Sequence, residues 1–174
     1  MFENLIINSL YSFKIKGFVN KSRGIFLQEG EDWVLIKSLF SDYRLDGYQL
    51  LNKKYILSIN QSENDIFTQK VLEANEKNQL QILDIPLSMF SLFDYFLKQN
   101  IVFSIQTNKE DRINVGCIDK LNDKSIFLTP ITPKGIWEEN HYYNFRKEFI
   151  RIIEFDTDYI NSLVVYSKIE NNGK

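Results

Sequence analysis

Residues 24–39 read GIFLQEGEDWVLIKSL, and residues 116–131 read GCIDKLNDKSIFLTPI. Each stretch begins with glycine, runs through apolar residues to a polar turn, and ends in a second apolar run. Short apolar runs bounded by turns are typical of β-strands. A second related pair follows, DGYQLLNKKYILSI at 46–59 and NHYYNFRKEFIRII at 140–153. The chain therefore reads as one small unit written twice, which predicts a duplicated fold.

The spacing between the two copies is nearly constant. Val34 matches Ile126 at an offset of 92 residues, and Ile56 matches Ile150 at an offset of 94. Two extra residues in the loop at 130–139 account for the change, because surface loops tolerate insertions.

Each copy predicts about five short strands followed by a helix. Ser62 can cap the first turn of a helix and has an acidic residue three positions later, so we expect a helix at about 62–76. The apolar spacing at 157–166 predicts the second such helix. A third helix, at 88–97, carries Phe at helical spacing and is expected to pack between the units.

These elements predict a mainly β protein with helices (α+β). We expect two tandem small β-barrels, SH3-like or Sm-like, each followed by a C-terminal helix. The predicted domains are a first barrel with its helix at 1–78, a linker with the amphipathic helix at 79–100, and a second barrel with its helix at 101–174.

Composition restricts the class of function. The 174 residues are 44% hydrophobic, enough for a proper core, and the formal net charge is −2. Proteins that bind nucleic acid through its phosphates usually carry an excess of lysine and arginine, and this sequence has no such excess. Cys117 is the single cysteine, so it forms no intrachain disulfide or cysteine metal cluster, and we expect it to be a small buried core residue.

The N-terminal residues lack the apolar core of a signal peptide, and no apolar run approaches the roughly 20 residues that span a bilayer. We therefore expect a cytoplasmic protein with no membrane partner.

Residues 33–56, WVLIKSLFSDYRLDGYQLLNKKYI, resemble a pattern in small, largely uncharacterised bacterial proteins. That pattern is a strand, a turn containing Asp46-Gly47-Tyr48, and a strand that ends in lysine or arginine before isoleucine. The strand order, with a glycine in the second strand, resembles tandem Sm-like or SH3-like barrels and implies that fold. Neither copy combines the Asp-x-x-Asn and Arg-Gly motifs in the pair of loops with which Sm rings bind RNA bases.

The first candidate binding site contains Tyr43, Arg44, Asp46 and Tyr48. In one interpretation it is a polar recognition loop in which Arg44 makes forked contacts to a carboxylate, a phosphate or a base. In the simpler interpretation it is a turn, with Arg44 paired locally to an aspartate.

The second candidate site contains Trp137, His141, Tyr143 and Arg146, with Tyr142 beside them. Aromatic rings with arginine can stack bases or anchor a protein partner. Alternating strand residues are usually half core and half surface, and this simpler interpretation predicts that Tyr142 or Tyr143 is buried.

No catalytic, cofactor or metal motif is present in the sequence. We therefore expect a non-enzymatic bacterial binding or adaptor protein, with no cofactor, that recognises a protein partner through exposed barrel loops. The alternatives are a single-stranded nucleic-acid-binding protein and an immunity-type inhibitor of a toxin.

Overall fold

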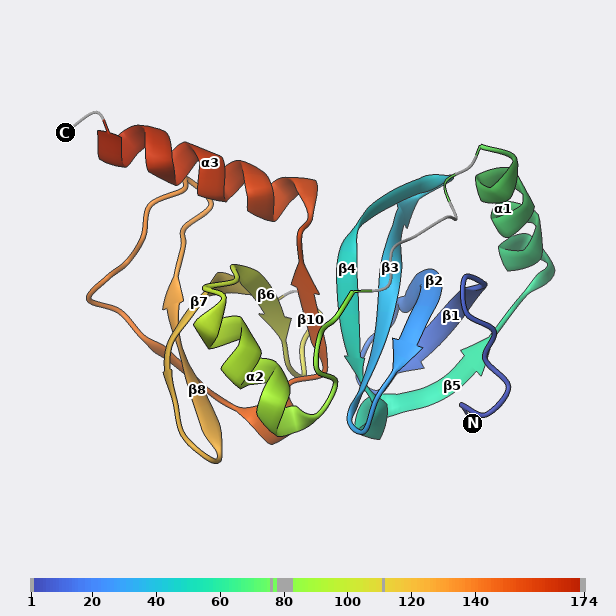
Figure 1. Ribbon diagram of the computed structural model, residues 1–174, viewed down its shortest axis with the longest axis horizontal. Coiled ribbons are helices and arrows are strands. Elements are labelled where there is room, and N and C mark those ends of the chain that lie inside the picture. The colour runs from blue at the N-terminus through green and yellow to red at the C-terminus, as the bar shows by residue number, and fades with distance from the viewer. Residues whose placement is uncertain (1, 76, 78–82, 111, 173–174) are drawn as a thin grey trace.

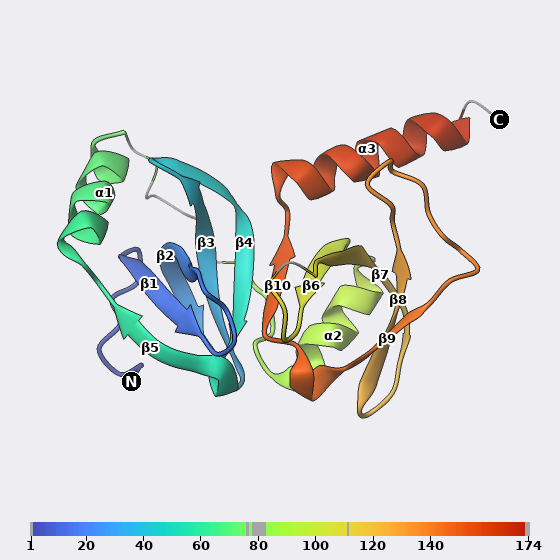
Figure 2. The ribbon, with the colours of Figure 1, turned by 180° about the vertical axis from the view of Figure 1, so that it is seen from behind.

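The computed structural model describes residues 2–75, 77, 83–110 and 112–172. Within them, ten antiparallel strands form one sheet, with three α-helices packed around it (Figure 1). The strand order is β5-β1-β2-β3-β4-β10-β6-β7-β8-β9. Figure 2 shows from behind that the first five strands lie on one side of the molecule and the second five on the other.

The first half comprises β1 (Leu10–Ile15), β2 (Lys21–Glu29), β3 (Trp33–Ser41), β4 (Arg44–Asn52), β5 (Ile56–Asn60) and α1 (Glu63–Ala74). The second half comprises β6 (Phe103–Gln106), β7 (Asn114–Leu121), β8 (Ser125–Pro130), β9 (Tyr143–Arg146), β10 (Ile152–Phe155) and α3 (Asp158–Asn172). Helix α2 (Met89–Lys98) precedes β6. Short 3-10 helices, Lys53–Tyr55 and Lys147–Phe149, precede β5 and β10.

The prediction of two closed tandem barrels is wrong. Strand β4 pairs with β10 of the second half, from Leu51–Ile152 to Tyr48–Phe155, so the ten strands form one open sheet. The overall class is α+β and rich in strands. The sequence of each strand has the pattern expected of a barrel strand. That pattern does not specify which two strands of the fold pair with it. The predicted boundary between residues 78 and 79 lies outside the described residues.

The two halves nevertheless share one strand order. The first half runs fifth, first, second, third, fourth (β5-β1-β2-β3-β4), and the second half runs the same way (β10-β6-β7-β8-β9). The register of β2 on β3 shifts by one residue after Phe26, and the register of β7 on β8 shifts after Ile118. A bulge therefore lies at the same place in both halves.

Gly24 and Gly116 are equivalent in space as well as in sequence. A Cβ built on Gly24 would lie 2.4 Å from the carbonyl oxygen of Lys37, and one built on Gly116 would lie 2.1 Å from that of Thr129. Both glycines are therefore required by the close approach of the neighbouring strand.

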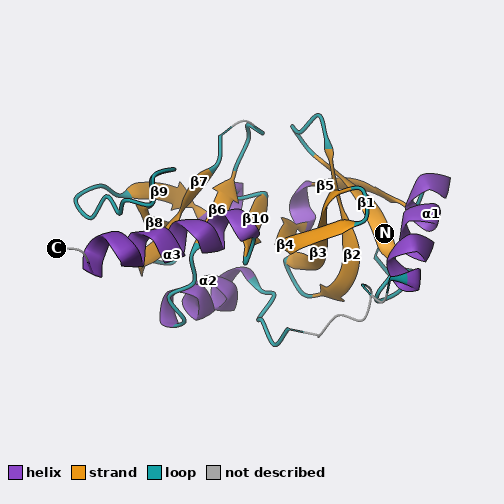
Figure 3. Cartoon of the chain, turned by 90° about the horizontal axis from the view of Figure 1, so that it is seen from above, coloured by secondary structure: helices purple, strands orange, loops and turns teal. Residues whose placement is uncertain are grey.

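The main core joins the two halves through α2. Its buried Leu92, Phe93 and Phe96 belong to one cluster that contains apolar side chains of both halves, among them Trp33 and Phe103. Figure 3 shows α2 below the strands of the second half. The helix begins where Ser88 caps its first turn and Asp32 accepts a hydrogen bond from the Met89 amide, at 2.5 Å. No described helix is long and apolar enough to cross a membrane.

Helix α1 is attached to the sheet through Asp65. The Asp65 carboxylate, with a side chain only 2% exposed, accepts hydrogen bonds from Ser12, Ser62 and the Arg23 guanidinium. Burial disfavours ionisation, but the bonds from Ser62 and Arg23 outweigh it and hold the pKa of Asp65 below its usual range. The predicted capping box at Ser62 is confirmed, and its acidic member also fixes the helix to β1 and β2.

Candidate functional site

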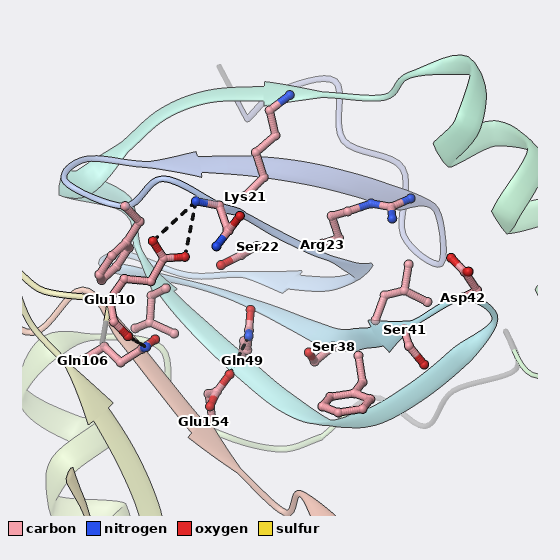
Figure 4. A pocket seen from close by; sticks show the side chains of 15 residues that line it. Lys21, Ser22, Arg23, Ser38, Ser41, Asp42, Gln49, Gln106, Glu110 and Glu154 are labelled. Carbon is pink, nitrogen blue, oxygen red and sulfur yellow. Dashed lines mark hydrogen bonds between the residues drawn. The ribbon is translucent and has the colours of Figure 1, made fainter. Parts of the chain in front are cut away.

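A polar cleft of about 360 Å³ lies where the two halves meet (Figure 4). Strands β2, β3 and β4 of the first half line it together with Gln106, Glu110, Ile152 and Glu154 of the second half. The cleft exists because β4 pairs with β10, so it could not form in two separate barrels.

At the floor of the cleft lie Gln49 and Glu154, and the buried Ser104 is the neighbour of Glu154 on the next strand. The register places Gln49 of β4 and Ser104 of β6 on either side of Glu154 in β10. Gln49 Nε2 donates to Glu154 Oε1 at 2.7 Å, and Ser104 Oγ donates to Oε2 at 3.3 Å. The Glu154 carboxylate is thus held in one orientation by neutral donors.

Glu110 ties the two halves together at one end of the cleft. Its carboxylate accepts hydrogen bonds from the backbone amides of Val19, at 2.9 Å, and Asn20, at 3.3 Å. The bond from Val19 is the main reason that the pKa of Glu110 lies below its usual range. Gln106 Nε2 donates to the Glu110 backbone carbonyl at 3.0 Å, which positions this loop against the floor.

The cationic side chains of the cleft are turned away from its floor. Arg23 points to Asp65, with nitrogen–oxygen distances of 2.8 and 3.0 Å, so its charge is already paired. Figure 4 shows the Lys21 side chain also directed away from Glu154. The interior therefore presents carboxylates and hydrogen-bond acceptors more than positive charge.

The cleft is lined mainly by amide, hydroxyl and carboxylate side chains. Nowhere in the described ranges do three or more His, Cys, Asp or Glu side chains converge as metal ligands. The described residues that line the cleft include no histidine, the side chain that most often activates a nucleophile, and no cysteine, itself a nucleophile.

The first sequence-predicted site is used for contacts inside the molecule. Arg44 pairs with Asp158 at the start of α3, at 2.7 Å, and Asp46 Oδ1 accepts a hydrogen bond from the Asp158 amide at 2.8 Å. The Tyr48 ring stacks on Phe155 at a centroid distance of 5.3 Å. Arg44 does pair with an aspartate, but its partner lies in the second half rather than nearby in the sequence.

The turn itself also differs from its expected place. Tyr43 has a φ of +56° at the turn between β3 and β4, whereas Gly47, with a φ of +57°, lies inside β4. A Cβ on Gly47 would lie 2.4 Å from Thr157 Cγ2. Only glycine therefore leaves room for Thr157, the residue before α3.

The second predicted site is divided between two places. Trp137 is half-buried beneath α3 beside Ile160 and Leu163, whereas Tyr143 and Arg146 lie on β9 at the end of the sheet. His141 is exposed, and its backbone amide bonds to the Glu138 carbonyl at 2.9 Å.

The expectation that Tyr142 or Tyr143 is buried is wrong. Tyr142 is 49% exposed and lies just before β9, and Tyr143, 40% exposed, begins this strand at the edge of the sheet. The two predicted sites do not form one surface, since β4 lies in the middle of the sheet and β9 at its end.

Cys117 is half-buried on β7 rather than a core residue. Burial is the main cause that raises the pKa of its thiol, and Asp119 adds to the effect. A thiol held protonated in this way is a poor nucleophile.

Sequence reasoning missed Gln49, Ser104, Glu110 and Glu154. The available signal was a polar residue inside an apolar strand, as in IIEF at 152–155. That signal does not indicate a cleft without the pairing of β4 with β10. Comparison of the sequence with models of known protein families, and with curated proteins, found no match.

Proposed function

We propose that this chain is a non-enzymatic bacterial binding protein that takes a basic side chain of a protein partner into the cleft between its halves. The observation that carries the proposal is the Glu154 carboxylate, fixed at the floor by Gln49 and Ser104. A carboxylate has about four acceptor positions, so two hydrogen bonds leave it able to accept more.

The charges around the cleft favour a cation. Asp42, Glu110 and Glu154 line it, while Arg23 is paired with Asp65 and Lys21 points away. An arginine or lysine side chain would therefore find acceptors of opposite charge. Arginine fits best, because its planar fork can donate two parallel bonds to one carboxylate.

The groups that would bind are held before a ligand arrives. Gln49, Gln106 and Ser104 already hydrogen-bond to the acidic residues, and the Glu110 loop is tied to the first half. Binding therefore orders few additional side chains, which favours affinity. The rim carries Phe40, 69% exposed, which offers apolar contact to the rest of a partner segment.

We place the protein in the cytoplasm, since a lone thiol such as Cys117 suits a reducing compartment.

The cleft replaces the exposed loops as the proposed recognition site, because Arg44, Asp46 and Tyr48 are already engaged within the molecule.

The test is titration of the ¹⁵N-labelled protein with N-acetyl-arginine amide, followed by amide chemical shifts. We expect shifts at Ser104, Gln106 and Glu154, and at least about tenfold weaker binding in Glu154→Gln, since a hydrogen bond to a charged group is worth about 1.5–3 kcal/mol. Glu148→Gln, which removes an exposed carboxylate paired with Arg146, is the matched control and should bind as the parent does.

N-acetyl-citrulline amide provides the charge control. It has nearly the shape of the arginine compound without its positive charge, so it should cause much smaller shifts. Equal shifts with both compounds, or equal affinity in Glu154→Gln, would contradict the proposal.

A further inference from the structure

The sheet has two outer edges, formed by β5 and β9. Exposed edge strands are usually protected by lysine, proline or a bulge, because their free backbone groups can pair with another strand. Strand β5 reads ILSIN and β9 reads YNFR, so neither contains lysine or proline and only Arg146 is charged. The pairing of β5 with β1 shifts register at Leu57, and the residues from Ser58 to Asn60 pair regularly.

Strand β9 is the counterpart of β4. In the first half Leu51 of β4 pairs with Val34, and in the second half Phe145 of β9 pairs with Ile126. Val34 and Ile126 occupy the same place in β3 and β8, directly comparable through the shared bulge. The side of β4 that β10 covers therefore corresponds to the free side of β9.

Strand β5 is the counterpart of β10. Phe13 of β1 pairs with Ile59 of β5, and Ile105 of β6 pairs with Ile153 of β10. The side of β10 that covers β4 therefore corresponds to the free side of β5.

We propose that copies of this chain assemble head to tail, with β9 of one copy paired antiparallel to β5 of the next. The junction would repeat the one that joins β4 to β10 inside the chain. The register follows from that junction, in which Gln49 lies opposite Glu154. The counterpart of Gln49 is Tyr143 and that of Glu154 is Asn60, so Tyr143 would lie opposite Asn60 of the next copy. This inference concerns a different surface from the cleft and stands independently of its ligand.

Exposed apolar side chains lie where this junction would bury them. Inside the chain the Arg151 guanidinium lies over the Tyr55 ring, 4.7 Å from its centre. The equivalent residues are Phe149 and Leu57, whose side chains are 48% and 54% exposed. In the proposed junction Phe149 would contact Leu57 of the next copy, so both would leave water.

The backbone of β9 also faces outward at the required positions. The Asn52 amide donates to the Arg151 carbonyl across the internal junction, at 2.9 Å. Outward and inward amides alternate along a strand, so Leu50 also faces β10. The counterparts Arg146 and Asn144 therefore direct their amides to the free side of β9.

A second copy fits these edges better than an unrelated strand does, because one molecule carries both complementary sides. The contact joins two different surfaces, so repetition yields a closed ring or an open filament. Either product supports the proposal, and both differ from a two-fold dimer.

The first test measures the molar mass of the full chain by light scattering over a hundredfold range of concentration. We expect the mass to rise above that of the 20.7 kDa monomer with concentration. Asn144→Pro, which removes an outward amide but no internal bond, should reduce association at least about tenfold. Asn144→Ala retains the amide and is the matched control. A constant monomer mass, or equal association of the two variants, would overturn the proposal.

The second test fixes the register and remains valid if Asn144→Pro does not fold. In a Cys117→Ser background, Tyr143→Cys and Asn60→Cys are made in separate chains and mixed under mild oxidation. Tyr143 and Asn60 would form a pair without mutual hydrogen bonds, whose Cα atoms lie about 4.5 Å apart, close enough for a disulfide. Covalent dimers should form in the mixture and much less in either variant alone. Equal yield with Leu57→Cys in place of Asn60→Cys would contradict this register.

Discussion

Lys53 in the first half and Lys147 in the second occupy equivalent positions, each at the start of a 3-10 helix. Their backbone amides make equivalent bonds, to the Asp32 and Lys124 carbonyls, both at 2.9 Å. Their side chains, however, make different contacts. Lys53 Nζ bonds to Glu29 at 2.5 Å and to the Gly30 carbonyl at 2.9 Å.

Lys147, in contrast, is only 3% exposed, and its Nζ has no hydrogen-bond partner among the described residues. It lies over the rings of Phe90, at 4.8 Å, and Phe93, at 6.0 Å, both in α2. The backbone hydrogen bonds are thus the same in both halves, while the two lysine side chains at this position have different neighbours. The presence of α2 over the second half accounts for this difference.

The largest expected effect is the loss of a shared scaffold position. Gly116→Ala should destabilise the fold by about 3 kcal/mol or prevent folding, because the added Cβ meets a backbone carbonyl that cannot move freely. Gly24→Ala should have a similar effect if the halves are equivalent. Asp119→Ala, exposed on the same strand as Gly116, is the control and should change the free energy of unfolding by less than about 0.5 kcal/mol. Thermal and urea denaturation provide the measurement, and tolerance of either alanine would break the equivalence.

The next effect should be confined to one half. Asp65→Asn leaves Arg23 without its anion and should destabilise the protein by about 3 kcal/mol, as expected when one member of a largely buried pair is lost. At the start of α3, Thr157 caps the Ile160 amide as Ser62 caps that of Asp65, but Ile160 is apolar and makes no ion pair. The neighbouring Tyr159 is 53% exposed, and Tyr159→Ala should cost less than about 1 kcal/mol. Similar losses in the two variants would show that the helices are attached in the same way.

The same carboxylate predicts a dependence on pH. The folded pKa of Asp65 lies below its ordinary value of 3.8, so the unfolded chain binds the proton more readily. The stability that Asp65 contributes is therefore present above pH 3.8 and is lost as the pH falls through the folded pKa. The difference in free energy of unfolding between the parent and Asp65→Asn should shrink in this range, and a constant difference would contradict the assignment.

The smallest effect should have opposite signs at the two lysines. Lys147→Met should stabilise the protein by about 1 kcal/mol at pH 7, because it removes a buried charge without a hydrogen-bond partner. Lys53→Met should destabilise it by up to about 1 kcal/mol, since its bonds are partly exposed. Denaturant titration of both variants separates these outcomes.

The effect of Lys147 also has a pH signature. Burial lowers the pKa of Lys147 from its ordinary value of 10.5, so the unfolded chain binds the proton more readily below that value. Parent stability should rise as the pH approaches 10.5, and the advantage of Lys147→Met should decrease. An advantage that is unchanged at pH 10 would point to packing rather than charge.

The sequence predicted the strands and helices well, because each carries its own local signal. The capping serine at Ser62, the spacing of Phe93 and Phe96 and the repeated glycines at Gly24 and Gly116 are examples. The pairing of Leu50 with Ile153 has no local signal, because residues so far apart in the sequence meet only in the folded sheet. The cleft depends on that pairing, so Glu154 could be recognised as a strand residue but not as part of a site.

The pairing of β4 with β10 has a consequence for synthesis on the ribosome. Leu51 emerges roughly 100 residues before its partner Ile152, which at translation rates of about 5–20 residues per second is roughly 5–20 s. Throughout that interval the edge of β4 has no partner from its own chain. Neighbouring nascent chains on one messenger RNA therefore expose the same edge at the same time, and timely arrival of the last strand decides between correct folding and exchange of strands between chains.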